Sequence, residues 1–259
     1  MVAGCTDYYC RPNARPLADD VLDLTGLGEV RGIAETAECV RIGALTTWSE
    51  LAASALPPQF DALREAARQI GGVQIQNAGS VGGNLCNASP AADGVPPLLI
   101  LNASVELRSQ AGTRVLPLGD FIVGNRRTVL GPDELLTAVT VPKRTSRQAS
   151  AFHKLGARAY QVISIVMVAA LLELDALGRV GSAAVAVGSC SPVAQRLPAL
   201  EEALTGRDLA GPPLSDLLAE AHFAPLTPLS DVRGTAAYRL DAAHLLVGRA
   251  LDGLQARLR

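Results

Sequence analysis

The spacing of hydrophobic residues predicts strands followed by helices in the second half of the chain. Three segments carry apolar residues in the pattern of strands: 150–155, 164–174 and 180–187. A turn at Leu177-Gly178 joins the last two of them. Apolar residues three and four positions apart then predict three helices: 199–204, 214–221 and 236–258. Helices packed on one face of an antiparallel sheet produce this order of elements.

The first half of the chain begins with shorter predicted elements. Residues 40–43 predict a strand, and a helix is predicted to begin after Thr47, because Glu50 follows three positions later as in a capping box. A second helix is predicted over 59–69. This half therefore mixes helix and strand.

Two further strand signals follow in the same half. Alternation over 103–118 predicts a hairpin turned at Ala111-Gly112. Another strand over 135–141 is stopped by Pro142. Together with the elements above, these signals predict an α+β fold.

Glycines cluster between the predicted helix and the hairpin. Gly71, Gly72, Gly79, Gly82 and Gly83 fall within thirteen residues, so we expect no regular element there and a long loop instead. Long loops inside compact domains are uncommon unless they have a function. This loop is therefore the first candidate for a binding site.

The polar, charged segment 142–148 begins with a proline and is expected to be exposed. It predicts a boundary between a first domain, 1–145, and a second domain, 146–259. No internal repeat or low-complexity tract accompanies it.

Composition excludes several classes of protein. Hydrophobic residues make up 49% of the 259 residues and charged residues 19%, which suits a globular chain with a sizeable core. A net charge of -2 lacks the basic surface that nucleic-acid binding needs. The longest apolar run, 162–172, is too short to span a membrane, and the N-terminus has no signal-peptide pattern, so a cytoplasmic protein is expected.

Cysteine and histidine usage argues against a metal site. The five cysteines are scattered and form no CxxC pair: Cys5, Cys10, Cys39, Cys86 and Cys190. The three histidines are isolated, and structural roles are expected for all of them: His153, His222 and His244. No acid-base constellation is visible either, so we expect neither a metal nor a catalytic side chain.

Two glycine-containing segments have the chemistry of a phosphate cradle, namely 3–7 and 79–84. Neither contains lysine or arginine, so backbone N–H groups and the hydroxyls of Thr6 and Ser80 would have to meet a pyrophosphate. The lysine-containing loop of nucleotide hydrolases is absent, and 79–83 does not follow a strand as a Rossmann fingerprint must. On glycine spacing alone, ordinary turns remain an equal alternative.

The continuation of the second segment resembles a known family. GSVGGNLCNASPAADGVPP, residues 79–97, is similar to the second FAD-binding segment of the flavoprotein subunits of molybdenum hydroxylases, such as xanthine dehydrogenase and carbon monoxide dehydrogenase. VAGCTD, residues 2–7, resembles their first segment, A-G-G-T-D, with Cys5 in place of the second glycine. Phe152 with Lys154, and 230–234 followed by Tyr238-Arg239, resemble their C-terminal signatures.

This resemblance implies a fold. The family pairs an FAD-binding domain of the vanillyl-alcohol oxidase type with a smaller C-terminal domain made of an antiparallel sheet and helices. Because only two residues separate Met1 from Gly4, the first domain is expected to lack the strand and helix that usually precede the first FAD-binding segment.

The resemblance also implies roles for individual residues. Two runs match the family positions that clasp the FAD pyrophosphate: Gly4, Cys5, Thr6, Asp7, Tyr8 and Ser80, Val81, Gly82, Gly83, Asn84. Asp93 would accept hydrogen bonds from ribose or nearby hydroxyls, while Ile70 and Leu136 would pack on the cofactor. Lys154 matches a lysine near the pyrimidine edge of the flavin. Gln161 and Val162 depart from the family, which often has acids there.

Each residue also has a structural interpretation. Lys154 could be an ordinary solvated lysine, and Asp93 could cap the segment before Pro96-Pro97. Ile70 and Leu136 are expected to be core residues with or without a cofactor. Asp231 and Arg233 are expected to form a structural ion pair or a cap for the last helix.

In such complexes the substrate is hydroxylated on a molybdopterin-binding subunit and electrons pass through a 2Fe-2S subunit to FAD. The resemblance therefore implies that this chain is the last relay before an acceptor such as NAD, quinone or oxygen. Three alternatives stay open: a self-contained flavin oxidase or dehydrogenase, a flavin-free assembly subunit, and an α+β protein that binds another phosphate ligand.

Overall fold

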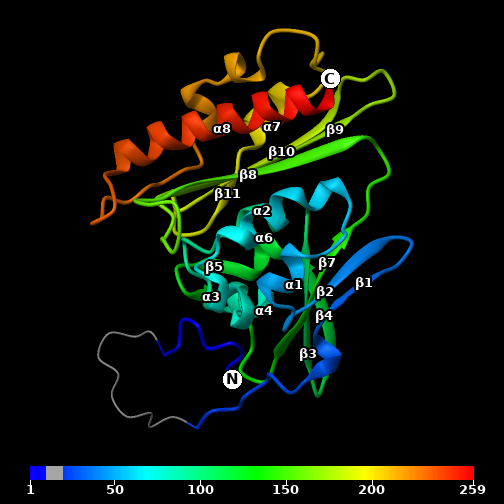
Figure 1. Ribbon diagram of the computed structural model, residues 1–259, viewed down its shortest axis with the longest axis vertical. Helices are drawn as coiled ribbons and strands as arrows, with labels where there is room; N and C mark the ends of the chain where they lie inside the picture. The colour runs from blue at the N-terminus through cyan, green and yellow to red at the C-terminus, as the bar shows by residue number, and fades with distance from the viewer. Residues whose placement is uncertain (10–19) are drawn as a thin grey trace.

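The computed structural model describes residues 1–9 and 20–259, and its helices and strands form two sheets covered by helices. A five-stranded antiparallel sheet in the order β1-β2-β7-β3-β4 belongs to the first half of the chain. A four-stranded antiparallel sheet in the order β11-β10-β9-β8 belongs to the second half. In Figure 1 the second sheet lies between the long helix α8, in red, and the helices of the first half. The expected α+β fold is confirmed.

The described residues of the first half form seven short strands and a series of short helices. Its strands are β1 (Ile33–Glu35), β2 (Cys39–Gly43), β3 (Ser104–Ser109), β4 (Gly112–Pro117), β5 (Ile122–Gly124), β6 (Arg127–Thr128) and β7 (Leu135–Pro142). Its helices are η1 (Gly28–Val30), α1 (Trp48–Ala52), η2 (Pro58–Phe60), α2 (Asp61–Gln69), α3 (Val73–Ala78), α4 (Val81–Asn87), α5 (Val95–Ile100) and α6 (Leu118–Phe121). The predicted strands over 40–43 and 135–141 are confirmed, and so is the helix over 59–69, whose first turn is a 3-10 helix.

The capped helix start and the hairpin are also present. Thr47 accepts a hydrogen bond from the Glu50 N–H, and Glu50 accepts one from the Thr47 N–H at 2.8 Å, which completes the capping box. The hairpin turn lies one residue earlier than predicted, because Ser109 pairs with Gly112. Gly112 has a φ of 144°, a conformation that glycine adopts without strain.

The prediction of a long loop over 71–83 is wrong. Helix α3 and the start of α4 occupy this segment, and Ser80 caps α4 by accepting a hydrogen bond from the Gly83 N–H at 3.1 Å. Glycine here permits close packing rather than breaking the helix. A Cβ at Gly82 would lie 2.7 Å from the Cβ of Ala44, so no other residue fits against that loop.

The second half forms the other sheet and its covering helices. Its elements are β8 (Gln148–Leu155), β9 (Val166–Leu174), β10 (Val180–Gly188), β11 (Gln195–Arg196), α7 (Pro198–Leu204), η3 (Leu214–Leu217), η4 (Glu220–Phe223) and α8 (Ala236–Leu258). The three predicted strands and the helices over 199–204 and 236–258 are confirmed. No helix within 1–9 and 20–259 is long and apolar enough to cross a bilayer.

The predicted helix over 214–221 is wrong. Two 3-10 turns, η3 and η4, replace it, and Leu218 between them is extended. Side chains of α8 hold the first turn: Gln255 accepts a hydrogen bond from the Leu214 N–H at 3.0 Å, and Asp252 accepts one from the Ser215 N–H at 2.9 Å. The apolar residues pack on α8 from these turns, so their spacing does not require a continuous helix.

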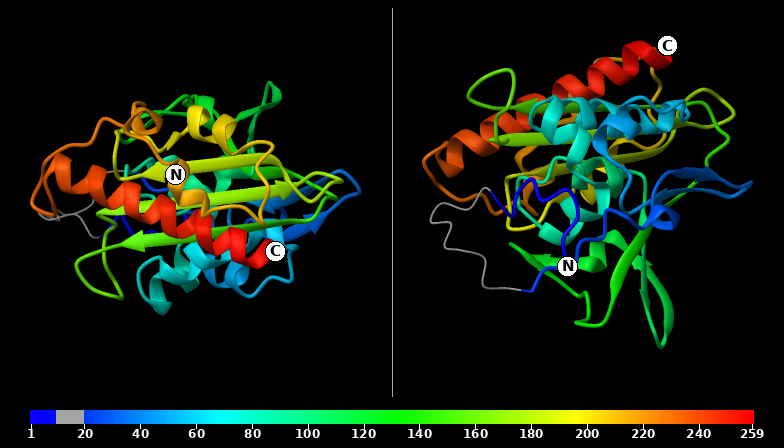
Figure 2. Two further views of the ribbon diagram at one scale, coloured as in Figure 1. Left: turned by 90° about the horizontal axis from the view of Figure 1, so that it is seen from above. Right: turned by 60° about the horizontal axis from the view of Figure 1, so that its bottom comes forward.

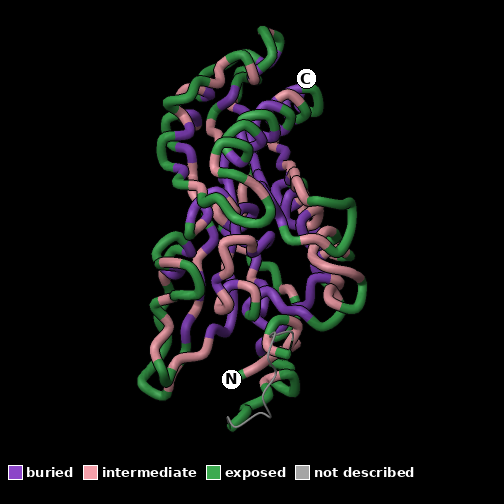
Figure 3. Tube along the Cα trace, turned by 90° about the vertical axis from the view of Figure 1, so that its left-hand side faces the viewer, coloured by how far each residue is buried: buried purple, intermediate pink, exposed green. Residues whose placement is uncertain are grey.

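Strand β9 is buried on both faces, which explains its nearly unbroken apolar sequence. Met167, Ala169 and Leu171 belong to the same hydrophobic cluster as the helices of the first half. Val168 and Leu172 alternate with them and belong to a second cluster with α7 and α8. The core of the first half therefore includes one face of the second sheet, and in Figure 3 the buried segments gather in the interior of the molecule.

A buried serine joins the two halves beside this core. Ser150 on β8 is fully buried, accepts a hydrogen bond from the Ala62 N–H at 2.9 Å and donates one to the Gln59 carbonyl at 2.9 Å. Arg257 of α8 pairs with Asp61 at 2.7 Å in the same region. Figure 2 shows α8 lying across one side of this sheet, opposite the helices of the first half.

Ser150→Ala tests the importance of this junction. It leaves the Ala62 N–H and the Gln59 carbonyl without their partner, so we expect the free energy of unfolding to fall by about 1–3 kcal/mol in urea denaturation. Ser104→Ala is the control, because the Ser104 hydroxyl is half-buried and bonds to no described residue. Equal stability of the two variants would contradict the role assigned to Ser150.

Candidate functional site

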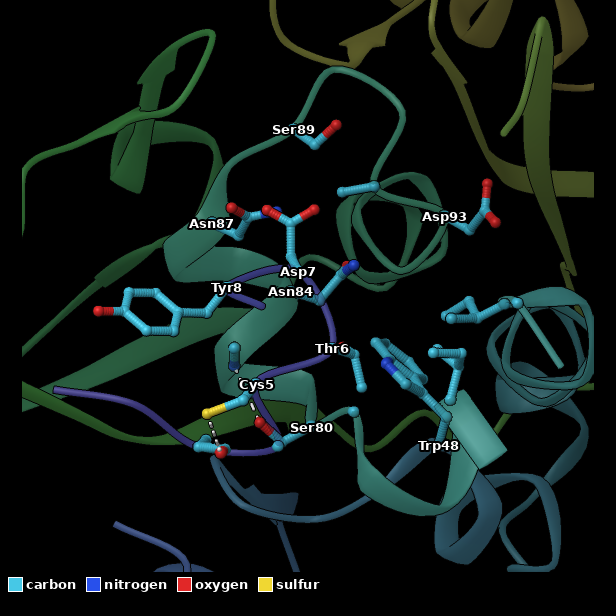
Figure 4. Close-up of a pocket in the computed structure, with 18 of the residues that line it drawn as sticks. Cys5, Thr6, Asp7, Tyr8, Trp48, Ser80, Asn84, Asn87, Ser89 and Asp93 are labelled. Atoms are coloured by element: carbon cyan, nitrogen blue, oxygen red, sulfur yellow. Dashed lines mark hydrogen bonds between the residues drawn. The ribbon is translucent and has the colours of Figure 1, made fainter. Parts of the chain in front are cut away.

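A cavity of about 960 Å³ opens where the N-terminal segment meets α3, α4 and the start of α5. Figure 4 shows Thr6, Asp7, Ser80 and Trp48 converging on it from separate segments. Most predicted site residues line this cavity: Gly4, Cys5, Thr6, Asp7, Tyr8, Ile70, Ser80, Gly83, Asn84 and Asp93. Its volume lies near the upper end of the roughly 300–1,000 Å³ typical of small-molecule sites.

The first glycine segment lines this cavity and has free backbone donors. The N–H groups of Gly4, Cys5, Thr6 and Asp7 donate no hydrogen bond to any described residue. Gly4 is pressed against the end of α3, since a Cβ there would lie 1.7 Å from the Ala78 carbonyl oxygen. The segment therefore lies against the chain just before Ser80, and its unused donors suit an anion.

Cys5 occupies this segment at an unusual backbone conformation. Its φ is 57°, in the left-handed region that glycine adopts more readily. Its Sγ lies 3.1 Å from the Ala3 carbonyl oxygen, to which it donates. The backbone at this position thus accommodates a cysteine side chain, whereas the flavoprotein family that the sequence resembles usually has glycine there.

The second glycine segment is built differently from the expected cradle. The Val81 N–H donates to the Thr46 carbonyl at 3.0 Å and the Gly82 N–H to the Ala44 carbonyl at 2.8 Å. The expectation that these two N–H groups face a ligand is wrong, because they anchor α4 to the loop before α1. Val81 and Gly82 are buried and do not line the cavity.

Asn84 supplies the polar group that this segment lacks. It lines the cavity, and its buried Oδ1 has no hydrogen-bond partner within 1–9 and 20–259. A buried polar atom without a partner costs stability, so it indicates a place for a ligand. Residues 4–7, with free N–H donors, and Asn84, with an unsatisfied acceptor, thus line one cavity.

A buried ion pair lies at the other end of the cavity. Lys154 Nζ lies 2.5 Å from Asp93 Oδ2 and donates to the Gln69 carbonyl at 3.0 Å, while the Ser164 hydroxyl donates to Asp93. Burial raises the pKa of the Asp93 carboxyl, and the charge of Lys154 with both hydrogen bonds acts in the opposite direction.

These contacts correct two structural interpretations. Lys154 is not a solvated lysine, because its side chain is only 4% exposed; it also does not line the cavity, from which Asp93 separates it. Asp93 does not cap α5, since the cap residue is Gly94 and no side chain caps that helix. Figure 4 places Asp93 apart from Asp7 and Tyr8, across Asn84 and Trp48.

An apolar wall runs between the two polar ends. Trp48 packs over Gly79 and Gly94: a Cβ at Gly94 would lie 2.4 Å from its ring. Ile70 lines this wall, whereas Leu136 lies in the core of the first half and is not among the lining residues. A ligand with flat apolar and charged parts fits such a cavity.

Trp48 and Arg126 are among the lining residues that sequence reasoning missed. Trp48 is the one tryptophan of the chain and directly follows the capping residue Thr47, which was a usable signal. Arg126 lies on the turn between β5 and β6, far from both glycine segments in sequence, and carries no motif. Only the folded chain brings it to the cavity.

The Cys86 thiol at the cavity is not activated, and the described residues provide no metal site. Burial raises the pKa of the Cys86 thiol to about 12, so it stays protonated. No group of three His, Cys, Asp or Glu side chains that could hold a metal ion occurs in the described part of the chain. The arrangement is suited to holding a ligand by position and electrostatics.

The histidines and Asp231 have structural contacts. His222 accepts a hydrogen bond from the Ala219 N–H at 3.2 Å, and His244 packs on Phe223 with ring centroids 5.1 Å apart. Burial lowers the pKa of His153. The expected ion pair of Asp231 with Arg233 is confirmed, and Asp231 also pairs with Arg239 at 2.7 Å. Cys10 lies outside the described residues.

Two protein families match the chain. Residues 1–144 match the FAD binding domain in molybdopterin dehydrogenase, and residues 150–254 match the CO dehydrogenase flavoprotein C-terminal domain. The nicotinate dehydrogenase FAD-subunit of Eubacterium barkeri is 36% identical over 69% of this chain, an alignment that spans 62% of that relative. The carbon monoxide dehydrogenase medium chain of Afipia carboxidovorans is 30% identical, with 99% of each chain covered.

A solved structure has the same fold. The carbon monoxide dehydrogenase of Hydrogenophaga pseudoflava, in a form that lacks the Mo-pyranopterin moiety of its cofactor, superposes with a TM-score of 0.84 at 29% identity. The alignment covers 91% of this chain and 81% of that one. The chain therefore belongs to the FAD-binding subunits of the molybdenum hydroxylase family, with FAD as its cofactor and a CO dehydrogenase-type C-terminal domain.

Proposed function

We propose that this chain holds FAD in the cavity described above and relays electrons from a 2Fe-2S subunit to an external acceptor, in a complex with a molybdopterin-binding subunit. We also assign its first half to the vanillyl-alcohol oxidase type of FAD-binding fold. The observation that carries the proposal is that unused N–H donors over 4–7, which suit a pyrophosphate, and the unsatisfied acceptor Asn84 Oδ1, which suits a donor group of the ligand, lie at one cavity. Bound FAD would supply the redox chemistry, while the protein supplies position and electrostatics.

The two glycine segments would hold the pyrophosphate in different ways. Backbone N–H groups of Gly4 to Asp7 would donate to it directly, with Tyr8 closing the segment. In the second segment, Ser80, Gly83 and Asn84 would face the ligand. Val81 and Gly82 would act indirectly, by fixing α4 to 44–46.

The buried pair would define the other end of the bound cofactor. Asp93 lines the cavity and would accept a hydrogen bond from a ligand hydroxyl, because an ionised carboxylate is an acceptor only. Lys154, directly behind it, fixes the orientation of the carboxylate and places a positive charge near that end. Ile70 would pack on the cofactor, whereas the buried Leu136 would support the site from the core.

The alternative functions, a self-contained oxidase and a flavin-free assembly subunit, each require different features of the cavity. A self-contained oxidase needs a catalytic base beside its substrate, and the two carboxylates that line the cavity are already paired, Asp93 with Lys154 and Asp7 with Arg126. A flavin-free assembly subunit would have no use for the free donors at 4–7. Both features favour the relay function.

The absorption spectrum of the purified chain tests the proposal. We expect an oxidised-flavin spectrum after incubation with FAD and desalting, which dithionite bleaches. Co-purification with molybdopterin and iron–sulfur subunits would then test the relay. A chain that retains no flavin after reconstitution would contradict the proposal.

Gly4→Ala tests the first segment. The added Cβ would overlap the Ala78 carbonyl, so the segment must move, and we expect FAD affinity to fall at least tenfold, about 1.4 kcal/mol. Gly26→Ala is the control, because nothing lies within 4 Å of its Cβ. Quenching of Trp48 fluorescence during FAD titration measures both, since Trp48 lines the cavity. Equal affinities would count against a binding role for this segment.

The Asp93–Lys154 pair is tested by a double-mutant cycle in urea denaturation. Lys154→Met leaves a buried carboxylate unpaired and should cost about 3–5 kcal/mol of stability. Asp93→Asn combined with Lys154→Met should recover part of that loss, because neither charge is then left alone. Purely additive effects would show that the two side chains are not coupled.

A further inference from the structure

FAD carries a negatively charged pyrophosphate, yet neither glycine segment contains a lysine or arginine. The fold supplies a cation from elsewhere. Arg126 Nη1 donates to Asp7 Oδ2 at 2.8 Å, across 119 residues of sequence, and also donates to Asn87. Arg126 is the one lysine or arginine side chain among the described residues that line the cavity.

The backbone around Arg126 is fixed in a costly conformation. Arg126 has a φ of 54°, a left-handed conformation that costs a non-glycine residue about 1–2 kcal/mol. Its N–H donates to the Ala88 carbonyl at 2.8 Å, which ties the β5–β6 turn to the end of α4. Gly124 and Asn125 precede it in this turn, and either residue type tolerates positive φ more readily. Strain of this kind concentrates at functional sites.

The Arg126 guanidinium has N–H donors that bond to no described residue. Nη1 makes both side-chain hydrogen bonds, while Nε and Nη2 donate to none of the residues in 1–9 and 20–259. The side chain is 56% exposed, so a ligand in the cavity can reach it. A planar group with several parallel donors matches the oxygens of a phosphate.

The position of Arg126 also solves an electrostatic problem. Asp7 follows the free N–H groups of the first segment, and its carboxylate would repel a phosphate bound there. The ion pair with Arg126 neutralises that carboxylate. Figure 4 shows Asp7 beside Asn87 at this end of the cavity.

We propose that Arg126 is the charged contact of the bound pyrophosphate, donating through the N–H groups that Asp7 and Asn87 leave free. This assignment rests on the proposed function, since it requires FAD in this cavity. It replaces the expectation that backbone dipoles alone meet the charge. The opposing explanation is that Arg126 only fastens the N-terminal segment to α4 through Asp7.

FAD titrations followed by Trp48 fluorescence at several salt concentrations separate the two explanations. Arg126→Gln keeps the same backbone requirement and removes the charge; we expect it to raise the Kd for FAD about tenfold to hundredfold. We also expect a weaker dependence of Kd on salt, because one screened charge contact is gone. Arg126→Lys should keep most of the salt dependence. Arg127→Gln, at the exposed neighbouring position outside the cavity, should match the wild type.

Each other outcome overturns the assignment. An unchanged Kd in Arg126→Gln removes the contact while leaving the proposed function intact. A raised Kd with the wild-type salt dependence leaves Arg126 as a fastening residue only. A wild-type chain that binds no FAD overturns the proposed function, and the Arg126 assignment falls with it.

Discussion

The sheet formed by β8, β9, β10 and β11 is covered on both faces, and the position of the cavity depends on this. Alternate residues of β9 belong to two hydrophobic clusters, one shared with the first half of the chain and one with α7 and α8. Burial of both faces fixes the first half against the sheet, because apolar surface on either side would otherwise meet water. Asp93, just before α5, is thereby held against Lys154 on β8 and Ser164 before β9.

The site combines local and distant contributions. Gly4 brings free backbone donors against the end of α3, and Arg126 arrives from the β5–β6 turn. Asp7 is where these contributions meet, since it belongs to the first segment and pairs with Arg126. In the proposed site, backbone donors and one guanidinium would take the place of the lysine found in many phosphate-binding loops.

Much of the fold could be predicted from the sequence, because periodicity reports burial directly: the nearly unbroken apolar run of β9 and the capping box at Thr47 are local signals. The position of a glycine in the sequence did not show whether it approaches a ligand or another part of the chain. Gly4 and Gly82 both permit close approach, but Gly82 faces Ala44 rather than a ligand, and spacing does not distinguish a neighbour from a cofactor. Arg126 could not be found at all, because no local pattern reports a contact 119 residues away.

The crystal structure of the FAD-loaded chain tests the central claim most directly. The account predicts electron density for FAD in this cavity, with the pyrophosphate against the N–H groups of residues 4–7, the Arg126 guanidinium within hydrogen-bond distance of a phosphate oxygen, and a donor group of the ligand near Asn84 Oδ1. Density for FAD elsewhere on the surface, with the Asn84 amide still unsatisfied, would contradict it.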